Sequence, residues 1–112
     1  MAKSLDFNKV KKQFFPVTLP GDDKPILVGT PNKALLNELI ELQKSVDSIP
    51  EDNVDEYTDA LYDVVARIMS QNKSGTVITV EELSQKLDDI EDLFIFCTNY
   101  MEFLNEIVSQ KN

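Results

Sequence analysis

Apolar residues recur at helical spacing along the C-terminal third of the chain. A first stripe steps alternately by four and three positions, as one face of an α-helix does, and consists of Leu83, Leu87, Ile90, Phe94, Cys97, Met101, Leu104 and Val108. A second stripe runs beside it and consists of Leu93, Phe96, Tyr100, Phe103 and Ile107. Because neither Gly nor Pro occurs after Thr76, we predict helix through most of this region.

The pattern leaves the number of helices in this region open. Thr79 followed by Glu82 is a capping-box sequence, so a helix is expected to begin there. One continuous helix to the end of the sequence would have about 30 residues, which is long for a small domain. Asp88 or Asp89 could instead cap a second helix, and we favour this broken arrangement.

Two further helices are predicted upstream. Thr30 as a cap and Pro31 at the first helical position open a helix over 31–47, which Ser48-Ile49-Pro50 ends. Its apolar face consists of Leu35, Leu36, Leu39, Ile40, Leu42 and Val46. Asn53 or Asp55 caps the next helix, expected over 54–72 and ended by Lys73-Ser74-Gly75. Its apolar face consists of Val54, Tyr57, Leu61, Val64, Val65, Ile68 and Met69.

The N-terminal part of the chain predicts a β-hairpin. Apolar and aromatic residues over 13–19 and 26–29 flank the turn-forming segment Pro20-Gly21-Asp22-Asp23-Lys24-Pro25. Pro16 lacks the N–H group that a strand donates, so the first strand is expected at a sheet edge or broken there. An isolated hairpin is only marginally stable in water, so this one must pack on the helices or pair with a second copy of the chain.

These elements predict one domain over 1–112 that is mainly α with a small N-terminal β-hairpin, an α+β fold. A flexible arm over 1–12 leads into the hairpin over 13–29 and a bundle of three to four helices over 30–112. The length of 112 residues suits one domain, and the 42% of hydrophobic and 28% of charged residues are typical of a globular chain.

Composition then restricts the function. The net charge of -9 argues against nucleic acid as a partner, because binding phosphates requires clustered cations. No apolar stretch reaches the roughly 18 residues that span a membrane, and residues 1–12 lack the apolar run of a signal peptide. We therefore expect a cytoplasmic protein that does not bind membranes.

Chemistry at an active site is not indicated either. Histidine is absent, which removes Ser-His-Asp and Cys-His catalysis, and no phosphate-binding glycine motif occurs. The acids over 88–92 lack the spacing of a calcium loop. Cys97, the single cysteine, stands among apolar residues and is expected to be a small buried hydrophobe. We expect no enzymatic activity, no cofactor and no metal.

Protein binding is the class of function that remains. With the second stripe, the predicted C-terminal helix has a broader apolar face than it needs to pack against one neighbouring helix. Both stripes could serve the core, against the helices at 31–47 and 54–72. Alternatively, the second stripe stays partly exposed as a docking face, because aromatic side chains bring large contact area with few rotatable bonds. The hairpin edge is another candidate, through strand addition. The candidate partner-binding residues are Phe96, Tyr100, Phe103, Ile107, Phe14 and Phe15.

The layout of the chain also resembles a known family. A Phe-Phe-Pro-Val-Thr-Leu-Pro strand (14–20) leads to Ile-Leu-Val-Gly-Thr-Pro (26–31) at a helix start, and Thr-Val-Glu-Glu-Leu (79–83) and Ile-Glu-Asp-Leu-Phe (90–94) lead to Tyr-Met-Glu-Phe-Leu (100–104). This order resembles the tail assembly chaperones of long-tailed phages and prophages of Gram-positive bacteria.

The resemblance implies a specific role. Such chaperones coat the tape measure protein before the tail tube forms around it, keep it soluble, help recruit tail tube subunits and are absent from the finished virion. The resemblance therefore implies the tape measure protein as partner, with the tail tube protein as a further partner, in the host cytoplasm. Whether the chain also forms a homo-oligomer stays open. The alternative is a small acidic adaptor or regulatory protein, such as an anti-repressor or a DNA mimic whose acids at 51–63 and 81–92 merge into one face.

Overall fold

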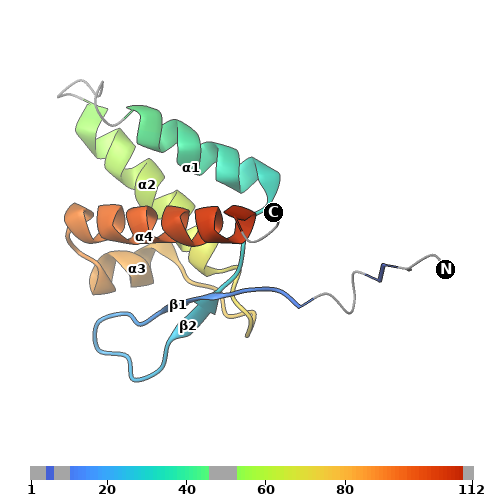
Figure 1. Ribbon diagram of the computed structural model, residues 1–112. Helices are drawn as coiled ribbons and strands as arrows, with labels where there is room; N and C mark the ends of the chain where they lie inside the picture. Colours follow the sequence, from blue (N-terminus) through green and yellow to red (C-terminus); the bar gives the residue numbers. More distant parts are fainter. Residues whose placement is uncertain (1–4, 7–10, 46–52, 110–112) are drawn as a thin grey trace.

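The computed structural model describes residues 5–6, 11–45 and 53–109, and every structural statement below concerns these residues (Figure 1). Strands β1 (Phe15–Val17) and β2 (Ile26–Val28) are followed by helices α1 (Lys33–Ser45), α2 (Val54–Met69), α3 (Val80–Lys86) and α4 (Ile90–Ser109). The predicted fold class is confirmed, since the chain is mainly α with a small N-terminal hairpin. The arm predicted over 1–12 lies mostly outside the described residues.

The hairpin is attached to the helices through backbone hydrogen bonds. β1 and β2 pair antiparallel, with Pro16 opposite Leu27. On the other side of β2, the N–H of Gly29 donates to the carbonyl of Gln71 at 2.7 Å, and the N–H of Lys73 donates to the carbonyl of Leu27 at 2.9 Å. β2 therefore lies between β1 and the segment after α2, and the prediction that Pro16 lies on an edge strand is confirmed.

Helix α2 supplies the centre of the core. Figure 1 shows α1 beside α2, with α4 crossing α2 and the hairpin and α3 on the far side of α4 from α1. Leu61, Val65, Ile68 and Met69 of α2 are at most 1% exposed. β2, α1 and α3 contribute one fully buried side chain each (Val28, Leu39 and Leu83), α4 contributes Leu93 and Tyr100, and β1 contributes none. None of the described polar or charged residues other than tyrosine belongs to this buried set.

The C-terminal region is two helices, which confirms the broken arrangement. The hydroxyl of Thr79 accepts a hydrogen bond from the N–H of Glu82 at 3.1 Å, so α3 begins at the predicted cap. Asp89 marks the start of α4, because its carboxylate accepts a hydrogen bond from the N–H of Glu91 at 2.9 Å. Local capping chemistry therefore divides this region, as predicted from the sequence.

The predicted start of α1 is wrong by two residues. Asn32, and not Thr30, caps the helix: its side-chain oxygen accepts a hydrogen bond from the N–H of Leu35 at 2.8 Å, and α1 begins at Lys33. Asn is at least as good a cap as Thr, so Pro31 stays in the connection from β2 instead of opening the helix. The segment predicted to end this helix, Ser48-Ile49-Pro50, lies outside the described residues.

Helix α2 ends at Met69, three residues before the predicted end. The side chain of Asn72 donates to the carbonyls of Met69 and Thr76 and accepts from the N–H of Thr76, which closes a local turn that competes with helix. At the other end, Asn53 precedes the helix without a side-chain capping bond. Val54, predicted on the apolar face, is 47% exposed in the first turn.

Each of the three tyrosines connects two elements through its hydroxyl. Tyr57 of α2 donates to the carbonyl of Leu42 in α1 at 3.0 Å, and Tyr62 of α2 donates to the carbonyl of Leu87 at the end of α3. Tyr100 of α4 donates to the carbonyl of Gly29 at the end of β2, at 2.8 Å. Burial raises the pKa of all three hydroxyls, so they stay protonated donors at neutral pH.

Candidate partner-binding site

The structure covers the second stripe of α4 more completely than the first. Leu93, Phe96 and Tyr100 of the second stripe are buried, with Phe96 6% and Tyr100 0% exposed. In contrast, Phe94 and Val108 of the first stripe are 36% and 66% exposed. Of the two alternatives for the second stripe, burial in the core is therefore confirmed for Phe96 and Tyr100, and exposure as a docking face is wrong for these two residues. The reason is that α4 is covered from two directions, by α2 and by the hairpin, and the second stripe lies between them.

Four of the predicted partner-binding aromatics converge in one cluster. Phe15 of β1 lies with its ring centroid 6.2 Å from that of Phe96, 6.0 Å from that of Tyr100 and 5.4 Å from that of Phe103. The rings of Phe96 and Tyr100 stack at 5.4 Å. These distances are typical of favourable aromatic pairs. The cluster joins the hairpin to α4, and only Phe15 and Phe103 keep part of their surface accessible.

The other two predicted residues lie apart from this cluster. Phe14 is half-buried, and the ammonium group of Lys73 lies 5.8 Å from its ring centroid, a cation–π contact at the surface. Ile107 is half-buried near the end of α4. No observation tests whether any of the six residues binds a partner, so that role stays a prediction.

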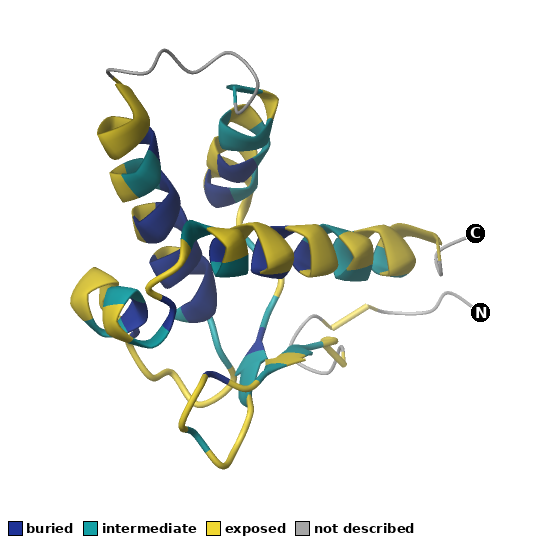
Figure 2. Cartoon of the chain, turned by 90° about the vertical axis from the view of Figure 1, so that its left-hand side faces the viewer, coloured by how far each residue is buried: buried dark blue, intermediate teal, exposed yellow. Residues whose placement is uncertain are grey.

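A groove of about 310 Å³ lies between the hairpin and α4. Its walls come from the segment 15–20 on one side and from Ile95 and Asn99 of α4 on the other, and its floor includes Met69 and Leu87. Asp92 is the one charged residue among those that line it. Ile95 is 53% exposed, and Figure 2 shows the exposed face of α4 running along its length. Sequence periodicity missed Ile95 because it belongs to neither stripe.

The edge of β1 is poorly suited to strand addition. The N–H of Lys73 bonds the carbonyl of Leu27, so the polar groups of Leu27 point away from β1. Pro16 pairs with Leu27 across the hairpin, and in an antiparallel pair the polar groups of both partners then point outward. Pro16 thus faces the open edge with a carbonyl but no N–H. A strand added to this edge would therefore find no N–H donor at Pro16, the middle residue of β1.

A second apolar depression lies on the other side of α4. It is lined by Phe94, Cys97 and Thr98 of α4 together with Tyr57 and Gln43. Cys97 is buried, as predicted, and burial raises the pKa of its thiol to about 11. The thiol is therefore protonated and unreactive at neutral pH. Nothing charged lines this depression, in contrast to the groove beside β1.

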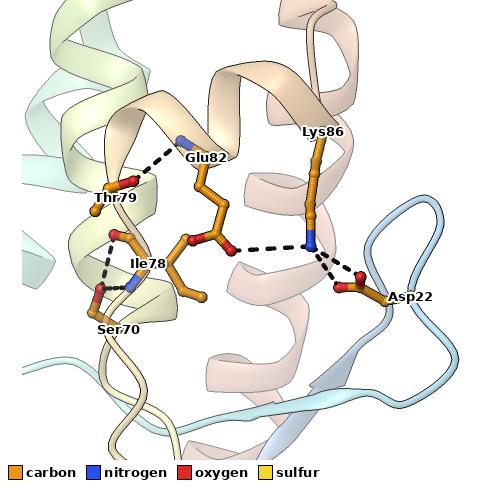
Figure 3. A network of polar contacts seen from close by, with 6 residues as sticks. All are labelled: Asp22, Ser70, Ile78, Thr79, Glu82 and Lys86. Atoms are coloured by element: carbon orange, nitrogen blue, oxygen red, sulfur yellow. Dashed lines mark hydrogen bonds and ion pairs between the residues drawn. The ribbon is translucent and has the colours of Figure 1, made fainter.

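Lys86, next to the groove residue Leu87, is paired with carboxylates. Figure 3 shows the ammonium group of Lys86 between two carboxylates, 2.9 Å from Asp22 in the hairpin turn and 3.9 Å from Glu82 one turn back in α3. In the same view, the hydroxyl of Ser70 accepts a hydrogen bond from the N–H of Ile78 at 2.9 Å, which fixes the connection into α3. These contacts hold α3 against the hairpin turn.

The described acidic residues of α2 and those of α3 do not gather into one face. The exposed acids of α2 start at its first turn, whereas those of α3 lie beside the opposite end of α2 (Figures 1 and 2). Within the described ranges, no group of three acidic or cysteine residues has an arrangement that could hold a metal ion. Nor does any described helix combine the length and apolarity needed to cross a membrane.

Comparisons with protein-family models, with curated proteins and with solved structures find no match for this chain.

Proposed function

We propose that the protein is a tail assembly chaperone of a long-tailed phage or prophage, which binds the tape measure protein and keeps it soluble during assembly. The observation that carries the proposal is the apolar surface that α4 leaves uncovered after packing. Phe94, Ile95 and Val108 of α4 are all exposed, on two different sides of the helix. A helix that is apolar on most sides is normally buried, so this one is suited to binding a further apolar surface.

The charge of the protein supports the same role. With a net charge of -9, copies of the chain repel one another, which keeps a protein with exposed apolar surface from associating with itself. A protein that shields aggregation-prone segments of another protein needs both properties together. The layout resemblance described above names the tape measure protein, with tail tube subunits as a second partner.

Co-expression tests the proposal. The tape measure protein of the same phage or prophage is expressed alone and together with this protein, and the soluble fraction is separated by size-exclusion chromatography. We expect the tape measure protein to move into the soluble fraction and to elute with this protein. An unchanged solubility, with separate elution, would refute the proposal.

A matched variant links the result to α4. Val77, which is 70% exposed in the connection before α3, provides a control site outside α4. The double variant Phe94→Ser/Ile95→Ser should lose the solubilising effect, whereas Val77→Ser should retain it. Thermal unfolding of both variants verifies that they remain folded.

A further inference from the structure

The groove between β1 and α4 has a chemistry that defines its partner, and this inference deepens the proposed function and rests on it. We infer that the groove binds an amphipathic α-helix whose apolar stripe is flanked by Lys or Arg. The groove is lined mainly by apolar side chains. Its hairpin wall includes Pro16, Val17 and Leu19, and its helix wall is centred on Ile95. Such a surface accepts apolar side chains.

The face of α4 that carries Ile95 is negatively charged. Counting by helical spacing from Ile95, Glu91 and Asp92 lie one turn before it, and Glu102 and Glu106 lie two and three turns after it, all on the same face. These are the only four carboxylates of α4, and α4 has no Lys or Arg. In the described part of the chain no cation pairs with any of them. The uncovered apolar residue is thus bracketed by unpaired negative charge.

A partner bound in this groove is better suited to a helical than to an extended conformation. An added strand would meet Pro16 on the edge of β1, where no N–H is available. A helix needs no backbone hydrogen bonds from its partner, and an amphipathic helix laid in an apolar groove is a common binding mode. The distance along α4 from Asp92 to Glu102 is about 15 Å, so cations about ten residues apart on a partner helix would meet both ends.

The charge also argues against a second copy as the occupant. In a symmetric pairing through this face, the carboxylates of one α4 would lie against those of the other, which is destabilising. Nucleic acid and anionic lipid are disfavoured for the same reason. A basic amphipathic helix satisfies both the apolar groove and its acidic border.

Two synthetic helical peptides test the inference. The first has a Leu stripe flanked by Lys, and the second is identical except that each Lys is Glu. Binding to the full chain is measured by fluorescence anisotropy at low and high salt. We expect the Lys peptide to bind and to weaken as salt rises, because exposed charge pairs are screened. Equal or tighter binding of the Glu peptide would overturn the inference.

Variants assign the binding to the groove. Ile95→Asp should weaken the Lys peptide at least about tenfold, since it replaces a buried apolar contact by a charge. Asp92→Lys should weaken it about two- to fivefold and improve the Glu peptide. Val77→Asp, at an exposed aliphatic position outside α4 and away from the groove, should leave both affinities unchanged. If all variants bind the Lys peptide with the same affinity, the inference is overturned. It is also overturned if the wild-type chain associates with itself and Ile95→Asp abolishes that association.

The same variants separate this inference from the proposed function. If the Lys peptide binds through Ile95 but the tape measure protein stays insoluble with the wild-type chain, the proposed function fails and the groove assignment stands. If Ile95→Asp solubilises the tape measure protein as well as the wild-type chain does, the groove assignment is overturned and the proposed function stands.

Discussion

The hydroxyl of Tyr100 should stabilise the attachment of the hairpin to α4. This side chain is fully buried, and its hydroxyl donates to the carbonyl of Gly29 at 2.8 Å. Tyr100→Phe keeps the stacked ring and removes only the donor, which leaves a carbonyl without that partner. Such a loss costs about 1–2 kcal/mol. For a domain of this size, the melting temperature should fall by roughly 4 °C for each kcal/mol.

Urea unfolding followed by circular dichroism measures this change. The midpoint should fall while the slope with denaturant stays the same, because the variant exposes no additional surface. Tyr57→Phe is the matched control, since its hydroxyl bonds the carbonyl of Leu42 at the margin of the core, where water can replace the donor. It should cost less, about 0.5 kcal/mol. If Tyr100→Phe costs no more than Tyr57→Phe, the buried bond does not have the stabilising role assigned to it.

Three further predictions concern stability. Asp89→Ala removes the cap of α4 and should cost about 1 kcal/mol in urea unfolding, and Asp88→Ala, next to it, should cost clearly less; equal costs would contradict the capping role. Leu83→Ala should cost about 2–5 kcal/mol by opening a cavity in the core, whereas Val77→Ala should be close to neutral, a contrast that thermal unfolding checks. Stability should fall as the pH rises from about 9 to about 11, because the unfolded chain releases the Cys97 proton in this range and the folded chain retains it. In Cys97→Ala, the free energy of unfolding should decline less steeply over this range, by about 1.4 kcal/mol less per pH unit. An identical decline in both proteins would contradict the raised pKa of Cys97.

Local patterns predicted the elements well, because the groups that define them are close in sequence. Thr79 with Glu82, and Asp89 with Glu91, each form a cap within three residues, so the break between α3 and α4 could be predicted from the sequence. The hairpin was predicted from its turn residues in the same way. The start of α1 was missed because Thr30 and Asn32 are both good caps, and spacing alone does not decide between them.

The burial of α4 could not be predicted from its own sequence. Two stripes of similar apolarity run along the helix, and which of them is covered depends on how α4 crosses α2 and where the hairpin packs. Phe15 fills the space against Phe96 and Tyr100, and it comes from a strand far upstream in the chain. Helical periodicity cannot specify such a long-range contact, so it left the burial of Phe96 open and did not identify Ile95.

The two uncovered sides of α4 differ in charge, and this difference predicts how each would bind. The side with Ile95 carries all four carboxylates of the helix, whereas the side with Phe94 and Val108 has only Glu91 near it, three positions before Phe94. Binding at the first side gains from opposite charge, so it should be fast and should weaken with salt. Binding at the second side depends on apolar burial and should be little affected by salt. A partner that covers both sides should therefore lose only part of its affinity at high salt. Asp92→Lys should reduce the salt-dependent part, whereas Val108→Ser should leave it intact.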